Sequence, residues 1–277
     1  SLKQKVLTSA KSGDYDVTIV DQPWVAQFAN AEILQKIPEE LPEEDKEDIF
    51  GSFIEGMSFN GDMYAMPWKN DTKFLFYNKK MLKEAGFDSP PETWAELEEQ
   101  SKALKEQGIV EYPAVWSWSQ SEALVCDFVA VTGGYEGEIV EGQEPQFTSE
   151  GIKEGTSFMA SSLENGISNP NSTEYLEQDV LDTFINEQAA FGLNWSFMYN
   201  EVKNSDIGDQ LGVTLVPGTD KVRSATVYGG EGLGITSGSD NPEAAWKYIQ
   251  FLTSKEVQKN NIDITLPIWE SLYEDEE

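Results

Sequence analysis

The sequence predicts an α/β protein, in which strands and helices alternate along the chain. Short β-branched or aromatic runs recur, as at residues 16–20 and 74–77, and have the composition of buried strands. Longer segments between such runs carry apolar residues at helical spacing and are bounded by capping residues and glycines. Interleaving of this kind indicates helices layered on sheets.

The first predicted strand lies at 16–20 and is followed by the polar and aromatic loop 21–24. A helix is expected at about 25–34, and the acidic stretch 39–48, interrupted by Pro42, reads as a solvated connection. A turn at 61–67 then leads into an extended segment and the second strand at 74–77.

Capping residues mark the next two helices. Asn78 can cap a short helix that ends at Gly86. Thr93 and Glu96 form a capping-box pattern, which opens a helix that Gly108 closes.

The second half of the chain shows the same alternation of strands and helices. No internal sequence repeat is found. The predicted helices are 150–165, 173–186 and one that starts at Asn241 and Pro242. The predicted strands are 190–194, 211–216, 225–228 and 233–236.

Composition excludes several classes of function. The chain has 277 residues, 39% of them hydrophobic, and no run approaches the roughly 18 apolar residues of a membrane span. A formal charge of -31 repels phosphate backbones, so nucleic acid and acidic membrane surfaces are poor candidate partners, and no nucleic acid is expected to bind. The charge itself is interpreted as a solvated surface.

The scarcity of histidine and cysteine removes much enzyme chemistry. The sequence has no histidine and one cysteine, which excludes His-dependent triads, the usual zinc sites and intramolecular disulfides. No cofactor or metal is therefore expected. Cys126 lies in an apolar run and is predicted to be a small buried hydrophobe.

The distribution of tryptophans points to a carbohydrate. A pyranose has an apolar C–H face and a rim of hydroxyls, so its receptor needs flat aromatic surfaces beside polar side chains. Five tryptophans fall at strand ends or in loops beside such residues, namely Trp24, Trp68, Trp116, Trp118 and Trp195. The polar candidates beside them are Asp21, Gln22, Asn70, Asp71, Gln120, Glu122 and Asn194. Trp94, Trp246 and Trp269 are assigned to packing.

A glycine-rich segment at 229–234 does not match a nucleotide loop, because it lacks the P-loop lysine and the dinucleotide spacing. Its glycines instead allow a flexible crossing segment in which the backbone approaches a ligand. Gly230 and Glu231 are therefore candidate ligand contacts, with Glu231 accepting hydrogen bonds from hydroxyls.

Two other functions use the same residue types. Tryptophans beside carboxylates also hold ammonium groups, so a receptor for a cationic solute such as a polyamine is one alternative. A glycoside hydrolase is the other, although 50 acidic residues make paired carboxylates uninformative.

The ordered succession of short motifs resembles the family 1 extracellular solute-binding proteins of ABC sugar importers, the group that contains the maltose- and trehalose-binding proteins. The match covers nearly the whole chain. Its landmarks are residues 15–17, 21–24, 64–72, 77–79, 85–87, 90–94, 133–135, 184–190, 194–195, 229–230, 241–246 and 266–269.

This resemblance implies a two-lobed periplasmic-binding-protein fold of type II, with the ligand in a cleft between the lobes. Residues 1–69 and 232–265 would form lobe 1, and residues 70–231 and 266–277 lobe 2. In the family, the segment matching 21–24 contributes cleft contacts, the position matching Asp71 binds hydroxyls, and the aromatic matching Trp195 stacks on a sugar. The loop 116–122 lines the cleft as well.

The resemblance also implies a monomeric extracytoplasmic protein that captures a mono- or oligosaccharide and delivers it to a permease without transforming it. Family members carry further segments on both sides of the matched region, so we expect the chain to be an interior portion that lacks N-terminal and C-terminal segments. A cysteine upstream of Ser1 would carry a lipid anchor.

Overall fold

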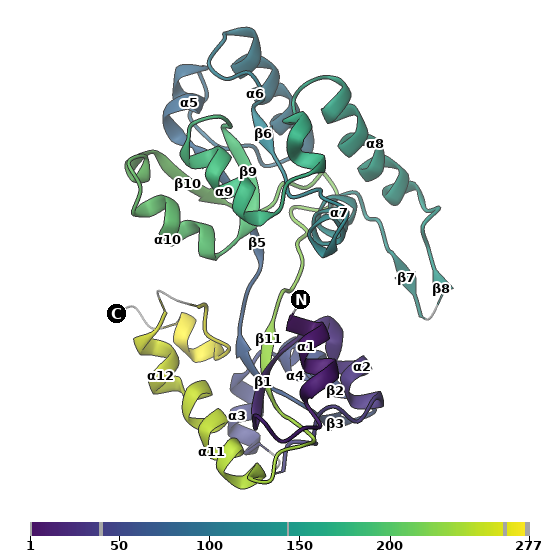
Figure 1. Ribbon diagram of the computed structural model, residues 1–277. Helices are drawn as coiled ribbons and strands as arrows, with labels where there is room; N and C mark the ends of the chain where they lie inside the picture. The colour runs from purple at the N-terminus through teal and green to yellow at the C-terminus, as the bar shows by residue number, and fades with distance from the viewer. Residues whose placement is uncertain (1, 39–40, 143, 263–264, 275–277) are drawn as a thin grey trace. The chain divides into compact units, whose positions relative to one another are not determined.

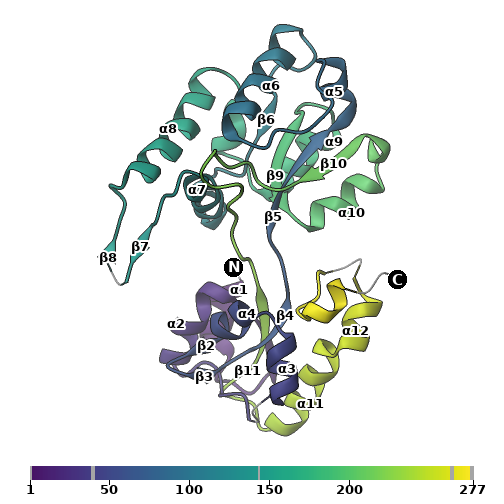
Figure 2. The same ribbon diagram turned by 180° about the vertical axis from the view of Figure 1, so that it is seen from behind.

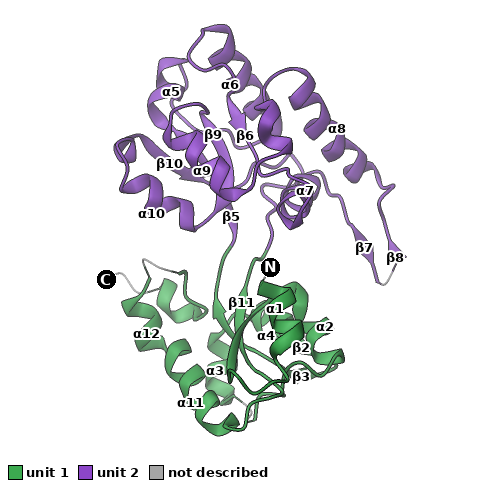
Figure 3. Ribbon diagram, viewed as in Figure 1, with its two compact units in different colours: residues 1–71, 228–277 green, residues 72–227 purple. Residues whose placement is uncertain are grey.

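The computed structural model describes residues 2–38, 41–142, 144–262 and 265–274. The chain divides into two compact units, residues 1–71 with 228–277 and residues 72–227 (Figure 3). Both units contain a sheet covered by helices, which confirms the predicted α/β class. Among the described residues, none of the helices combines the length and the apolar character needed to cross a bilayer.

Unit 1 is built on a three-stranded antiparallel sheet in the order β1-β11-β4. Its strands are β1 (Val17–Asp21), β4 (Met66–Lys69) and β11 (Glu231–Ile235), with a small ribbon of β2 (Ser58–Phe59) and β3 (Asp62–Met63). Its helices are α1 (Leu2–Ser9), α2 (Val25–Asn30), α3 (Glu43–Asp48), α4 (Gly51–Gly56), α11 (Pro242–Thr253) and α12 (Lys255–Asn260), with 3-10 turns at Gln22–Trp24 and Glu270–Tyr273.

Alternating side chains of β1 face two different cores. Val20 is fully buried in a cluster with Phe28 and residues of α1, whereas Val17 and Ile19 pack against a second cluster that includes Trp246 and Ile249 of α11. Helices α1 and α2 lie on one side of the sheet and α11 on the other (Figures 1 and 2). This period-two alternation makes unit 1 a helix–sheet–helix sandwich.

Unit 2 holds a four-stranded sheet in the order β10-β5-β9-β6, in which only the β6–β9 pair is parallel. Its strands are β5 (Lys73–Asn78), β6 (Ala114–Val115), β9 (Phe191–Trp195) and β10 (Leu211–Thr214), with a separate ribbon of β7 (Val140–Glu141) and β8 (Glu144–Pro145). Its helices are α5 (Lys79–Glu84), α6 (Trp94–Glu106), α7 (Glu122–Gly134), α8 (Glu150–Glu164), α9 (Glu177–Ile185) and α10 (Phe197–Lys203), with 3-10 turns at Pro170–Thr173 and Gly208–Gln210.

Adjacent residues of β5 also divide between two cores. Leu75 packs with α6, α7 and α8, whereas its neighbour Phe76 packs with α9 and α10. Phe191 and Leu193 of β9 join the first of these cores. Unit 2 is therefore layered in the same way as unit 1, and Trp195 continues the face of Phe191 and Leu193 to the end of the strand.

The ends predicted for α5 and α6 are confirmed. The Asn78 side chain accepts hydrogen bonds from the backbone N–H groups of Lys80 and Met81, and the Thr93 hydroxyl accepts one from Glu96 at 3.1 Å. Gly108 follows α6 with a φ of 70°, a conformation in which other residues are strained.

Four predicted segments differ from the structure. The acidic stretch at 39–48 is not only a connection, since Glu43–Asp48 forms α3 after Pro42; its first two residues, 39–40, lie outside the described residues. The strand expected at 225–228 does not form, because residues 224–227 join no regular ladder. The helix predicted at 25–34 already ends at Asn30, and the one predicted at 173–186 begins only at Glu177, after the 3-10 turn at Pro170–Thr173.

The two units also differ from the predicted lobes at residues 70–71, 228–231 and 266–274, which lie in unit 1. Residues 263–264 and 275–277 of the predicted lobes lie outside the described residues. Packing explains why residues 266–274 belong to unit 1. Ile268 and Trp269 are buried in the core that holds Trp246, and the Trp269 indole N–H donates to the Thr253 carbonyl at 2.8 Å. The burial of Trp94, Trp246 and Trp269 confirms their assignment to packing.

Thr93 and Ser121 provide a matched test of helix capping, since both are N-cap residues but only Thr93 accepts a cap hydrogen bond. We expect Thr93→Ala to lower the free energy of unfolding by about 1 kcal/mol, because a helix N–H loses its acceptor. Ser121→Ala should change it by less than about 0.5 kcal/mol. Urea unfolding followed by circular dichroism measures both, and equal losses would contradict the assigned cap.

Candidate functional site

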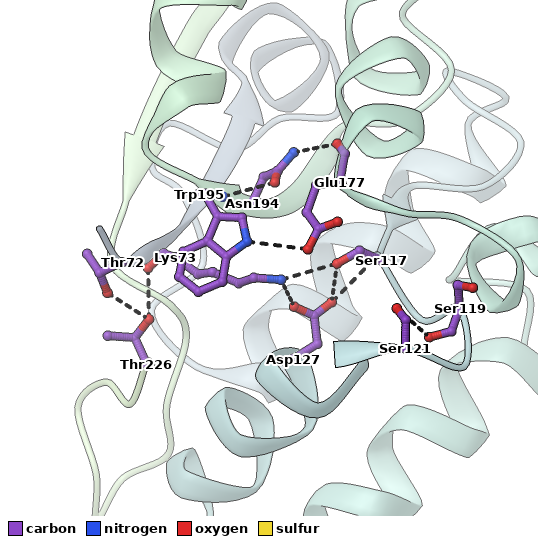
Figure 4. A network of polar contacts seen from close by, with 10 residues as sticks. All are labelled: Thr72, Lys73, Ser117, Ser119, Ser121, Asp127, Glu177, Asn194, Trp195 and Thr226. Carbon is purple, nitrogen blue, oxygen red and sulfur yellow. Dashed lines mark hydrogen bonds and ion pairs between the residues drawn. The ribbon is translucent and has the colours of Figure 1, made fainter. Parts of the chain in front are cut away.

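Trp195 ends β9 as a half-buried indole that is held at its edge and on one face. Its indole N–H donates to the Glu177 carboxylate at 3.4 Å, and the Lys73 ammonium lies 5.0 Å from the ring centroid (Figure 4). Lys73 is the residue directly opposite Trp195 in the β5–β9 ladder. Strand pairing therefore places the cation beneath the aromatic ring.

Lys73 belongs to a buried ion pair. Its ammonium lies 2.5 Å from the Asp127 carboxylate and donates to the Ser117 hydroxyl at 3.1 Å, and the side chains of Lys73 and Asp127 are both fully buried. The Ser117 N–H donates to the same carboxylate at 3.3 Å. Burial raises the pKa of Asp127, and the Lys73 ammonium opposes that rise.

Asn194 supports the strand end and does not face a ligand, contrary to the sequence prediction. It is fully buried, its amide donates to the Glu177 carbonyl at 2.9 Å, and its oxygen accepts the Trp195 N–H at 2.9 Å. Both polar groups of the side chain thus bind backbone atoms.

Trp116 and Trp118 are core residues, which corrects their assignment to a ligand site. Their exposed fractions are 0% and 5%, and their rings stack in parallel with centroids 5.4 Å apart. The Trp116 indole N–H donates to the buried Ser168 hydroxyl at 2.6 Å. Large aromatic rings in this setting contribute packing energy to unit 2.

The remaining candidates of unit 2 are accessible. Gln120, in the loop before α7, and Glu122, at the start of α7, are both exposed. Cys126 on the same helix is half-buried, less than its prediction as a core hydrophobe implies, and burial raises the pKa of its thiol to about 11.

In unit 1 the predicted polar residues gather at one edge of the sheet. Asp21 at the end of β1 is directly opposite Glu231 at the start of β11, and Glu231 is opposite Lys69 at the end of β4. The Lys69 ammonium lies 3.3 Å from the Glu231 carboxylate. Both side chains are one-third exposed, so part of the carboxylate and part of the ammonium group remain accessible to solvent.

The end of β4 and the segment that follows it continue this edge. Trp68 is half-buried against the core of unit 1, with the Lys69 ammonium 5.5 Å from its ring centroid. The Asn70 amide donates to the Tyr273 hydroxyl at 2.7 Å, and the Asp71 carbonyl accepts the Gly229 N–H at 2.9 Å. Of these candidates, Asp71 contacts the glycine-rich segment through Gly229, whereas Asn70 is paired with Leu266 and Tyr273.

A cavity of about 440 Å³ opens beside Gln22, which lines it together with Glu55, Ser52 and Ser58. Trp24 lies next along the chain, packed at a tilt against Phe28 with centroids 5.7 Å apart. Of these two candidates, only Gln22 lines the cavity.

Gly230 is buried against Tyr228, which the sequence analysis did not select. A Cβ on Gly230 would lie 1.7 Å from the Tyr228 hydroxyl, so no side chain fits there. The Tyr228 ring stacks on Phe53 with centroids 4.4 Å apart, and its hydroxyl is buried without a hydrogen-bond partner. Burial raises the pKa of this hydroxyl well above its usual value.

Sequence reasoning missed four further residues of this geometry, Lys69, Lys73, Asp127 and Glu177. One signal was present, because Asp127 interrupts the apolar run 124–129 and a carboxylate in such a run needs a buried partner. Among the described residues, no group of His, Cys, Asp and Glu side chains is arranged to hold a metal ion.

Comparison with known protein families gives one match over most of the chain. The profile of a family described as bacterial extracellular solute-binding protein matches residues 1–259.

Individual relatives are distant in sequence, but the matches cover most of this chain. A probable ABC transporter-binding protein of Deinococcus radiodurans is 25% identical over 257 residues, which cover 90% of this chain and 61% of the relative. A maltotriose-binding protein of Pyrococcus abyssi is 26% identical over 260 residues, 92% of this chain and 54% of the relative. The chain thus spans between half and two thirds of the length of these relatives.

Among solved structures, the maltose-bound MalE3 of T. maritima is similar with a TM-score of 0.87 and 28% sequence identity. The match covers 99% of this chain and 71% of the solved one.

Gly230 offers a test of the geometry around Tyr228. We expect Gly230→Ala to destabilise the protein by about 1–3 kcal/mol, because the new methyl group would overlap the Tyr228 ring. Gly51→Ala is the control, since a Cβ there has nothing within 4 Å. Thermal unfolding measures both, and the combination Gly230→Ala with Tyr228→Ala should cost less than the sum of the single losses. Strict additivity would contradict the contact.

Proposed function

The chain belongs to the bacterial extracellular solute-binding protein family, and from this premise we propose that it captures a mono- or oligosaccharide and delivers it to the permease of an ABC importer. The family and the fold are those of binding proteins, and on this proposal the sugar is released unchanged. The protein acts as a monomer outside the cytoplasmic membrane, either free or lipid-anchored.

Trp195 is the observation that carries this proposal. Its ring is half-buried at a strand end, and its orientation is fixed by the Glu177 carboxylate and the Lys73 ammonium. A flat, immobile aromatic surface suits the C–H face of a pyranose, because stacking then costs little conformational entropy.

Polar groups for hydroxyls are available in both units. Glu177 lies at the edge of the Trp195 ring in unit 2, and unit 1 presents Asp21, Gln22 and Glu231 along one sheet edge. The expectation that both sets line one cleft stays a prediction. The names of two similar proteins support the ligand class, since one binds maltotriose and the other was solved with maltose.

The tryptophan environments argue against the cationic alternative. Lysine ammonium groups lie over Trp24, Trp68 and Trp195 at 5.8, 5.5 and 5.0 Å from the ring centroids. Each ring therefore already has a cation on one face, which weakens the attraction of its other face for a polyamine ammonium. Stacking of a neutral sugar does not depend on that attraction.

Trp195→Ala tests the proposal directly. A saturating neutral sugar at a hundred times its Kd should stabilise the wild-type protein by about 2.7 kcal/mol, which raises its melting temperature by several degrees. Loss of the indole should weaken binding by about 2 kcal/mol, roughly 30-fold in Kd. A thermal-shift screen of mono- and oligosaccharides followed by calorimetry measures both effects.

Tyr248→Ala is the matched control, because Tyr248 is a 54% exposed aromatic residue on α11 and is not among the candidate ligand contacts. It should leave the Kd unchanged. Stabilisation by spermidine with no response to any sugar, or release of hydrolysis products from an oligosaccharide, would overturn the proposal.

A further inference from the structure

A fully buried ion pair lies directly beneath the Trp195 ring. Lys73 and Asp127 come from β5 and α7, and Ser117 between β6 and α7 donates its N–H to the carboxylate and accepts from the ammonium (Figure 4). The polar groups of this network thus satisfy one another inside unit 2.

Stability does not explain such a pair. Removing two charges from water costs several kcal/mol, and replacing a buried pair by apolar side chains of similar size is often neutral or stabilising. The neighbouring core already consists of apolar residues such as Leu75, Ala130 and Val131, among which an apolar pair would fit. A buried charge pair at this position therefore calls for another role.

The contacts of Lys73 indicate that role. Apart from Asp127 and Ser117, its ammonium meets the Trp195 ring. The N–H edge of the ring is held by a second contact, because the indole N–H donates to Glu177. Among the described residues no other aromatic ring contacts Trp195. The network therefore restrains one face and one edge of the indole.

We infer that Lys73, held in place by Asp127 and Ser117, is a positioning residue that fixes the Trp195 ring and reserves its opposite face for an uncharged ligand. The inference rests on the proposed function and adds a reason why the site would select uncharged ligands over ammonium ligands. A cation on one face of an aromatic ring weakens the attraction of the other face for a second cation, whereas stacking of a C–H surface depends mainly on dispersion. Lys73 thus contributes both orientation and discrimination against ammonium ligands.

The apolar double variant Lys73→Met with Asp127→Leu tests this inference. It removes both charges together, so neither is left buried alone. In protein labelled with 5-fluorotryptophan, the Trp195 resonance is assigned from Trp195→Phe. We expect this resonance to shift or broaden in the ligand-free double variant. The variant should stay folded with a melting temperature lowered by several degrees, because the buried Ser117 N–H loses its acceptor.

Binding should change in two ways in the same variant. The Kd for the best sugar of the screen should rise on the order of 10-fold, because the ring must now be ordered on binding, and spermidine should bind more tightly than it does to the wild type. In a Trp195→Ala background the double replacement should alter the sugar Kd by less than about twofold. Lys102→Met with Glu98→Leu, which removes an exposed ion pair on α6, is the control and should change none of these quantities.

Asp127→Asn provides a second variant of unchanged size, in which Lys73 loses its counter-ion and the Trp195 resonance should also broaden. An unaltered Trp195 resonance in either folded variant would overturn the positioning role, whether or not any sugar binds. An unaltered preference for sugar over spermidine would overturn the discrimination. Absence of all sugar binding by the wild type would instead count against the proposed function, and the resonance would still decide the positioning role.

Discussion

The antiparallel pairing of β5 with β9 is the constraint on which the candidate site of unit 2 depends. Its register places Leu75 opposite Leu193 and Lys73 opposite Trp195. Because side chains alternate along a strand, a slip by one residue would turn the apolar residues out of their cores and Lys73 away from the indole. The packing of two cores around this sheet therefore fixes the site as well as the fold.

Unit 1 achieves a comparable result through its own sheet. The three strands β1, β11 and β4 bring Asp21, Glu231 and Lys69 into one row, although the residues are far apart in the sequence. Gly230 then allows the chain to pass against the half-buried Tyr228 ring. Sheet register and one close backbone approach thus gather the polar candidates, and an acidic side chain is balanced by a neighbouring lysine.

The sequence predicted the α/β class and the capped helices, because these depend on local patterns. It selected Asp21 and Glu231 at the unit 1 edge but not Lys69, whose place beside them follows from the pairing of β11 with β4. It missed α7, since residues 123–131 are apolar on nearly every side of the helix and show no amphipathic stripe. It could not separate Trp116 from Trp195, because both have polar neighbours and only tertiary packing buries the first. The Lys73–Asp127 pair joins positions 54 residues apart, and no local pattern carries such a contact.

On the proposed function, Trp195 offers one fixed aromatic face to the apolar side of a sugar. Nuclear Overhauser effects between the Trp195 indole protons and a bound sugar can detect this stacking, because they report atoms within about 5 Å of each other. We expect contacts to the C–H protons of a single sugar ring, from the indole face opposite Lys73. Saturable sugar binding without any contact between that indole and the sugar would show that Trp195 does not bind the ligand.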